Sequence, residues 1–195
     1  MRFLFIVQGE GRGHLTQALT LEDMLRRNGH EVVEVLVGKS SSRTLPGFFN
    51  RNIKAPVKRF LSPNFLPSPD NKRANLKKSF AYNLIHLPEY VRSMCYINQR
   101  IRKTGAEVVI NFYELLTGLT YALFRPSVPY ICVGHQYLFL HHDFEFPDKS
   151  SCQLWMLRFF TRMTALKSSK KLALSFREME QDDNNQIVTV PPLIR

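Results

Sequence analysis

The sequence has few cysteines, no long apolar run and no excess of acidic residues. Its three cysteines are odd in number, far apart and without a C-x-x-C pair, which argues against a disulfide framework or a zinc site: Cys95, Cys132 and Cys152. No stretch reaches the roughly 18 uncharged apolar residues of a membrane span. The opening RFLFIV is also too short for a signal peptide's apolar region. We therefore expect a cytoplasmic protein from a reducing compartment.

Basic residues outnumber acidic ones, with 27 Lys and Arg against 16 Asp and Glu, which gives a net charge of +11. Such a charge favours contact with phosphates or with anionic lipid headgroups. No nucleic-acid-binding motif accompanies it, so we expect no nucleic-acid partner. With 195 residues, 44% of them hydrophobic, the chain is long enough to bury the core of a single domain.

Hydrophobic patterns alternate between strand-like and helix-like segments. Strands are expected at 2–7, 31–37, 58–61, 107–112, 130–133, 171–175 and 186–190, and helices at 15–28, 79–103 with a break at Pro88, 115–124 and 152–168. A proline-rich loop is expected at 62–78. This alternation predicts an α/β fold, a Rossmann-like parallel sheet with helices on both faces. Ligands of such folds bind at the carboxyl ends of the strands.

The stretch QGEGRGH, residues 8–14, follows the first strand directly. It is not a dinucleotide fingerprint, because G-x-G-x-x-G requires a last glycine where His14 stands, and the second strand ends without an acid for a ribose. The later VGKSSS is not a P-loop either, since the first glycine of that motif would fall on Val33. The glycines alone are also compatible with a tight turn that merely joins strand to helix.

His14 makes a chemical role more attractive than a simple turn. A histidine at a helix N-terminus lies beside unsatisfied N–H groups and the positive end of the helix dipole, which lowers its pKa and favours the neutral ring. A neutral imidazole can accept a proton from a hydroxyl near pH 7. The same N–H groups can hold a phosphate or a sugar hydroxyl.

The segment GEGRGHLTQALTLEDMLRRNGHEV resembles the amino-terminal signature of GT-B glycosyltransferases, G-x-G-x-G-H followed by a helix and then G-H-x-V. It is most similar to the bacterial MurG and glycolipid-synthase group. Two later segments extend the likeness over nearly the whole chain. VVINFYELLTGLTYALFRPSVPYICVGHQYLF is similar to that group's fourth and fifth strands, and VPPLIR to its interdomain linker.

The resemblance implies that residues 1–190 are the acceptor-binding Rossmann-like domain and that 191–195 begin the linker. The donor-binding domain, which grips the nucleotide-sugar, would lie outside this chain. It also implies that His14 is the general base of an inverting transfer, and that no cofactor or catalytic metal is needed. The loop facing the diphosphate and the acceptor would be shaped by Gly9, Gly11 and Gly13. Arg12, in the same loop, is a further candidate for substrate binding, with a solvated position as the alternative.

One departure from the family pattern concerns the partner of His14. Many relatives carry an aspartate after the fourth strand that orients the histidine, whereas this chain has Asn111. Asparagine cannot stabilise an imidazolium by charge. Either Glu114, three residues later, takes that part, or His14 works without an acidic partner.

The segment GHQYLFLHHDFEFPD follows the fifth strand. His135 and Gln136, just beyond the carboxyl end of that strand, are candidates for lining the acceptor pocket, with simple packing as the alternative. His141 and His142 with the nearby acids are not expected to bind a metal. Adjacent histidines on an extended segment point in opposite directions.

The apolar helix expected at 152–168 fits a core helix. An interfacial role is the alternative, with Arg158, Arg162 and Lys167 at headgroup level and aromatic residues dipping inward. The basic and apolar loop NFLPSPDNKR would add a second contact. A peripheral membrane position and a lipid-linked acceptor would explain both features.

The leading hypothesis is an inverting, nucleotide-sugar-dependent glycosyltransferase, represented by its acceptor domain, that acts on a glycan or lipid-linked acceptor. The chain alone is expected to be nearly inactive. Two alternatives stay open: the acceptor subunit of a split glycosyltransferase, and a non-catalytic module that binds an anionic sugar or headgroup. A redox function would require NAD or FAD, which the glycine spacing disfavours.

Overall fold

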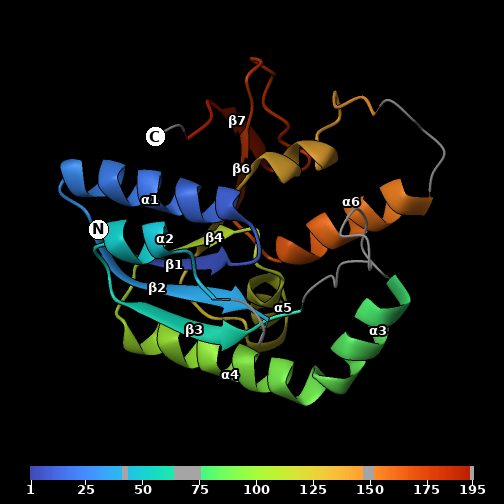
Figure 1. The fold of residues 1–195 in the computed structure, drawn as a ribbon. Coiled ribbons are helices and arrows are strands. Elements are labelled where there is room, and N and C mark those ends of the chain that lie inside the picture. The colour runs from blue at the N-terminus through green and yellow to red at the C-terminus, as the bar shows by residue number, and fades with distance from the viewer. Residues whose placement is uncertain (41–43, 64–75, 147–151, 194–195) are drawn as a thin grey trace.

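The computed structural model describes residues 1–40, 44–63, 76–146 and 152–193. Seven strands within these ranges form one parallel sheet, in the order β3-β2-β1-β4-β5-β6-β7, with helices on both faces (Figure 1). The predicted α/β class is thus confirmed. The strands are β1 (Arg2–Gln8), β2 (Glu31–Lys39), β3 (Val57–Leu61), β4 (Val108–Phe112), β5 (Tyr130–Val133), β6 (Lys170–Leu174) and β7 (Ile187–Val190).

The helices are α1 (Arg12–Arg27), α2 (Gly47–Asn52), α3 (Leu76–Ile85), α4 (Leu87–Lys103), α5 (Leu115–Phe124) and α6 (Cys152–Thr164), with a short 3₁₀ helix η1 (His135–Leu140) after β5. None of the helices in the described ranges combines the length and the apolar character that crossing a bilayer requires. Residues 64–75 of the expected proline-rich loop lie outside the described residues, and 76–78 already belong to α3.

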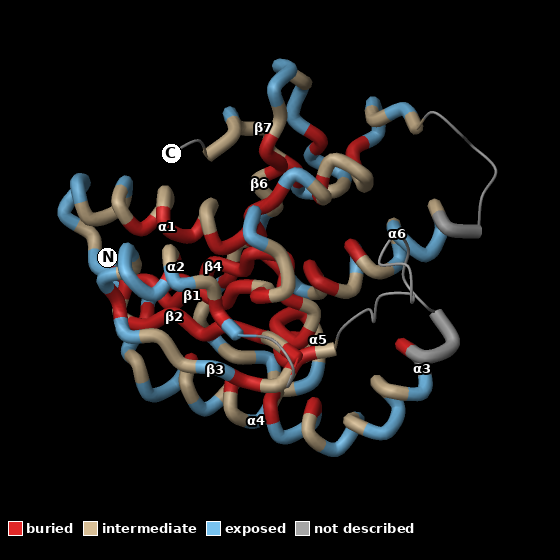
Figure 2. Tube along the Cα trace, viewed as in Figure 1, coloured by how far each residue is buried: buried red, intermediate tan, exposed pale blue. Residues whose placement is uncertain are grey.

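Each face of the sheet carries its own core, because successive side chains of a strand point to opposite faces. Leu4 and Ile6 of β1 pack with α4 and α5 on one face. Phe5 and Val7 pack with Leu15 and its neighbours in α1 on the other. Buried residues therefore run continuously along the central strands (Figure 2). This double covering explains why the strands read as uninterrupted apolar runs.

Three helix boundaries differ from the predicted ones. Helix α1 begins at Arg12 rather than Leu15 and so includes His14, while Gly29, with φ +75°, follows its end as expected. The region 79–103 divides into α3 and α4 at His86, and Pro88 lies in the first turn of α4, where its missing N–H costs no hydrogen bond. Helix α6 ends at Thr164, four residues early.

The order of the strands reverses between β1 and β4, since β2 and β3 extend the sheet on one side and β5 to β7 on the other. Val7 of β1 pairs with Phe112 of β4. The segments that follow these two strands therefore emerge side by side at the carboxyl edge. Doubly wound sheets bind ligands at such a switch point.

Candidate functional site

His14 lies at this switch point, in the first turn of α1. Its side chain is buried between two aromatic rings. The ring of Tyr113, just after β4, is nearly parallel to it, with 5.6 Å between the ring centroids and 18° between the ring planes. The ring of His135, the first residue of η1, is parallel to it at 6.4 Å and 7°. The histidine is thus held in a stack contributed by three separate elements.

Each ring nitrogen of His14 faces a glutamine. Nδ1 is 3.3 Å from Oε1 of Gln17, one helical turn further along α1. Nε2 is 3.1 Å from Nε2 of Gln136 in η1. Burial lowers the pKa of His14 to about 4, with a smaller lowering from His135, while the hydrogen bond to Gln17 opposes both. The ring is neutral, as the sequence predicts, and burial is the main cause.

The N-terminus of α1 is open, because Gly11 occupies the N-cap position and no described side chain caps this end. Arg12 and Gly13 are exposed in its first turn. Gly9 has a different reason to be glycine: a Cβ there would lie 2.6 Å from Cγ1 of Val37 in β2. The predicted glycine loop therefore combines one close approach of two strands with a helix end that displays its N–H groups.

Asn111, at the position where many relatives carry the orienting aspartate, makes its hydrogen bonds with residues other than His14. Its Nδ2 donates to the backbone oxygens of Glu114, at 3.2 Å, and Thr164, at 2.9 Å. Its Oδ1 accepts from the N–H of Glu114 at 3.0 Å. The fully buried amide ties the turn after β4 to the end of α6. Asparagine suits this position because it both donates and accepts.

Glu114 is not a partner of His14 either. It caps α5, and its Oε1 accepts from Oγ of Ser62, at 2.5 Å, and from the N–H of Leu116, at 3.2 Å. Oε2 is buried without a hydrogen-bond partner among the described residues. Burial raises the pKa of Glu114 to about 7, with a further increase from Glu10, although the hydrogen bonds from Ser62 and Leu116 oppose it. Glu114 is thus a buried carboxyl poised to titrate near neutrality.

Two residues that contact His14, Gln17 and Tyr113, were not predicted from the sequence. Gln17 stands three residues after His14, a helical spacing that brings two side chains to one face and that could have indicated the contact. Tyr113 adopts φ +61°, an unusual conformation for a tyrosine, and its hydroxyl lies 2.8 Å from Oγ1 of Thr161 in α6. No local pattern distinguishes it, because its role depends on α1 and α6 packing at the same strand end.

A cavity of about 440 Å³ opens beside the histidine. It is lined by Thr16, Gln17, His135, Leu174, Phe176, Pro192 and Leu193. Its walls come from α1, η1, β6 and the segment after β7. Two predicted features, the segment after β5 and the expected linker, therefore meet next to His14.

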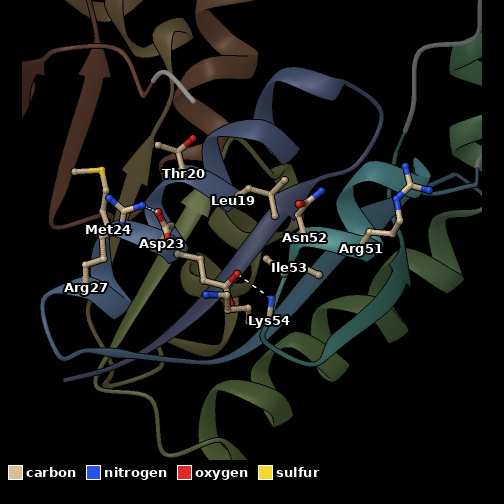
Figure 3. Close-up of a pocket in the computed structure, with 10 residues that line it drawn as sticks. Leu19, Thr20, Asp23, Met24, Arg27, Arg51, Asn52, Ile53 and Lys54 are labelled. Carbon is tan, nitrogen blue, oxygen red and sulfur yellow. Dashed lines mark hydrogen bonds and ion pairs between the residues drawn. The ribbon is translucent and has the colours of Figure 1, made fainter.

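Other cavities lie elsewhere, two of them against α1 and against α4 and α5. One of about 700 Å³ lies between the second half of α1 and residues 51–54 (Figure 3), and the ion pair between Asp23 and Arg27 lies at its edge. It shares no lining residue with the cavity beside His14. The other, of about 330 Å³, is mostly apolar and is lined by α4, α5 and Phe160 of α6.

His141 and His142 do not point in opposite directions, which corrects the expectation from sequence. Their rings stack at 4.7 Å, and both approach Asp182. Hydrogen bonds already engage both nitrogens of His141, since Nε2 contacts the backbone oxygen of Glu180 at 2.9 Å and Nδ1 accepts from the N–H of Asp143 at 3.1 Å. These contacts join the segment after η1 to the loop before β7.

Known proteins resemble this chain in sequence family and in fold. A family model described as glycosyl transferase family 1 matches residues 1–195. The solved UGT2 of Phytolacca americana, complexed with UDP-2fluoro-glucose and pterostilbene, superposes with a TM-score of 0.62 at 13% identity over 100% of this chain and 54% of its own. UGT89C1 of Arabidopsis thaliana, complexed with UDP, superposes with a TM-score of 0.57 at 14% identity, over 100% of this chain and 49% of its own.

MurG of Acinetobacter baumannii matches with a TM-score of 0.47 at 12% identity, over 92% of this chain and 43% of its own. Among curated proteins no sequence matches significantly. The chain spans about half the length of the solved structures that it resembles. The structural likeness shows a shared GT-B half-domain fold, and the family model covers every residue. The chain therefore belongs to glycosyl transferase family 1.

Proposed function

We propose that this chain is the acceptor-binding part of an inverting glycosyltransferase that uses a nucleotide-sugar donor. The observation that carries the proposal is the neutral, buried ring of His14, held at the switch point beside a cavity of about 440 Å³. A neutral imidazole next to a ligand-sized cavity suits the removal of a proton from an acceptor hydroxyl.

In the proposed reaction, Nε2 of His14 takes the proton of the acceptor hydroxyl while the hydroxyl oxygen bonds to the anomeric carbon. The bond from that carbon to the nucleotide diphosphate breaks, and the diphosphate leaves with the electron pair. His135 lines the acceptor cavity, Gln136 lies against Nε2 of His14, and the open N–H groups of α1 would face the negatively charged donor. A donor diphosphate nearby would raise the pKa of His14 and so make it a stronger base. No metal or cofactor takes part in these steps.

The donor-binding half would be supplied by residues outside 1–195, either in the same polypeptide or in a separate subunit. The rim of the acceptor cavity supports an interface there. Phe176 is 89% exposed, and Pro192 and Leu193, which line the cavity, belong to the proposed linker that begins at residue 191. Residues 1–190 form the acceptor domain in this proposal. An exposed aromatic at a cavity mouth suits contact with another domain.

We also propose that α6 rests on the cytoplasmic surface of a membrane, which would place the acceptor site near a lipid-linked acceptor. Trp155, Met156 and Phe159 are exposed on this helix, whereas the sequence favoured a core position. Arg162 is exposed in its last turns. Aromatic side chains with nearby arginines suit the interface of an anionic bilayer.

A non-catalytic sugar-binding or headgroup-binding module is the second candidate. One observation favours it: a histidine with a pKa of about 4, whose two ring nitrogens both contact glutamines, is a weak base. Such a module would use the same cavity and helix N-terminus to hold an anionic ligand, with no proton transfer.

The deciding experiment measures nucleotide release by the full-length gene product from a panel of nucleotide-sugars, with membrane lipid as acceptor. We expect release by the wild type and a loss of roughly 100-fold or more in His14→Ala. His30→Ala is the matched control, because His30 lies beyond the opposite end of α1. Equal nucleotide release by the wild type and His14→Ala would exclude His14 as the base. No release from any donor, with ligand binding intact, would favour the non-catalytic module.

A further inference from the structure

The contacts of His14 select one tautomer of its neutral ring. Oε1 of Gln17, which faces Nδ1, can only accept a hydrogen bond, and Nε2 of Gln136, which faces Nε2 of the ring, can only donate one. Both contacts are satisfied together only when the proton is on Nδ1 and the lone pair on Nε2. The nitrogen with the lone pair is the one that Gln136 covers.

The described groups that stack on the His14 ring carry no charge that would favour another protonation state of the ring. The titratable groups against its ring are Tyr113 after β4 and His135 of η1. Burial raises the pKa of Tyr113 and lowers the pKa of His135, so both are neutral at pH 7. A neutral ring needs no carboxylate to balance it, and an amide oxygen is sufficient to hold its proton.

We propose that Gln17 and Gln136 are the positioning residues of His14: Gln17 keeps the proton on Nδ1, and Gln136 occupies Nε2 until a ligand hydroxyl takes its place. Gln17 thus supplies the orientation that an acid provides in related sequences. The proposal rests on the proposed function only for the identity of the hydroxyl. The tautomer and the cover over Nε2 are properties of the protein itself.

Gln136 is suited to leave Nε2. Its Oε1 is buried without a hydrogen-bond partner among the described residues, and an unpaired buried carbonyl is costly. The side chain is only half-buried, so rotation toward solvent would hydrate that oxygen. An incoming hydroxyl that donates to Nε2 replaces the hydrogen bond that the ring loses. After this exchange Nε2 of His14 still accepts a hydrogen bond, and the amide of Gln136 is hydrated.

The first test needs no substrate. Nitrogen-15 NMR spectra of the chain distinguish a protonated ring nitrogen from one with a lone pair, and the spectrum of His14→Phe assigns the His14 signals. At pH 7 we expect the proton on Nδ1. A proton on Nε2, or an equal mixture, would overturn the proposal, because both glutamine amides would then be turned the other way.

The second test places a charge at Nδ1. Gln17→Glu keeps an oxygen acceptor there and should raise the pKa of His14 by roughly one unit or more, since an opposite charge at that distance favours the imidazolium. Gln99→Glu, on the exposed face of α4, is the matched control and should leave the titration unchanged. An unchanged pKa of His14 in the Gln17 variant would show that Gln17 does not contact Nδ1.

The third test measures how far Gln136 covers Nε2, through the rate at which diethyl pyrocarbonate acylates His14. Gln136→Leu keeps the bulk of the side chain but removes the donor, so we expect His14 to react several-fold faster relative to the exposed His142 in the same molecule. An unchanged ratio would contradict the covering role. These tests do not measure glycosyl transfer, so the proposed function can fail while they succeed, and the reverse.

Discussion

The carboxyl group of Glu114 lies against the Cα of Gly38, so near that a Cβ on the glycine would overlap both Oε2 and Cδ. Ser62, just after β3, binds the other oxygen of the same carboxyl. The ends of β2 and β3 therefore converge on the turn that follows β4. One buried acidic group holds three strand ends together directly beneath the edge of the sheet where His14 lies.

Gly38→Ala should destabilise the fold, because the added methyl group would overlap the buried carboxyl of Glu114 and the ring of Phe60. We expect a loss of about 1–3 kcal/mol in the free energy of unfolding, measured by urea denaturation. Gly13→Ala is the control, since a Cβ there meets nothing within 4 Å. Equal stability of both variants would contradict this packing.

The pKa of Glu114 makes stability depend on pH. Between the ordinary value of 4.5 and the folded value of about 7, the unfolded chain has lost a proton that the folded chain keeps. Stability from this group is therefore lost as the pH rises. Glu114→Gln should grow more stable relative to the wild type by up to roughly 3 kcal/mol between pH 4.5 and 7.5, measured by urea unfolding. If the unfolding free energies of the wild type and Glu114→Gln changed equally with pH, the pKa of Glu114 would not be raised.

His14 has the opposite effect. Its pKa falls from 6.5 to about 4 in the folded chain, so between these values the unfolded chain binds a proton that the folded chain does not. Stability is full above pH 6.5 and is lost as the pH falls toward 4. His14→Phe keeps an aromatic ring but cannot titrate, and the wild type should lose up to roughly 3 kcal/mol more than it on acidification from pH 7.5 to 4.

Asn111→Asp tests whether an acid at this position would serve as in related sequences. The carboxylate would face the backbone oxygens of Glu114 and Thr164, which now accept hydrogen bonds from the amide. We expect a loss on the order of 3 kcal/mol at pH 8 by urea unfolding, and no rise in the pKa of His14. Asn184→Asp, at an exposed position, should be neutral. A raised pKa of His14 would instead reveal contact between the two side chains.

The exposed face of α6 predicts binding to lipid vesicles. The chain should sediment with vesicles that contain anionic lipid, and less so at high salt. Trp155→Ser should weaken this binding several-fold, because the indole is 63% exposed and suited to the bilayer interface. Leu123→Ser removes a similarly exposed side chain from α5 and should have no effect. Equal binding by both variants would place the membrane contact elsewhere.

The sequence was sufficient for features carried by neighbouring residues. Alternating apolar segments predict the strands and helices because each pattern reports the period of its own element. The glycines and His14 after β1 predict a ligand site at the carboxyl edge of the sheet, since a parallel sheet brings its strand ends together. The same motif and its later counterparts indicate a glycosyltransferase, and a family model over residues 1–195 confirms it.

The partners of individual side chains depended on tertiary structure. Gln136 stands 122 positions from the ring nitrogen that it covers, and the amide of Asn111 reaches a carbonyl 53 positions away. Such contacts are decided by how the helices pack on the sheet and by which buried polar groups need a partner. The sequence was enough to predict a site at the carboxyl edge of the sheet with His14 in it, because that prediction needs only the local motif. The packing of α1 and η1 against the strand ends was needed to show that two glutamines, and no acid among the hydrogen-bond partners found, contact that histidine.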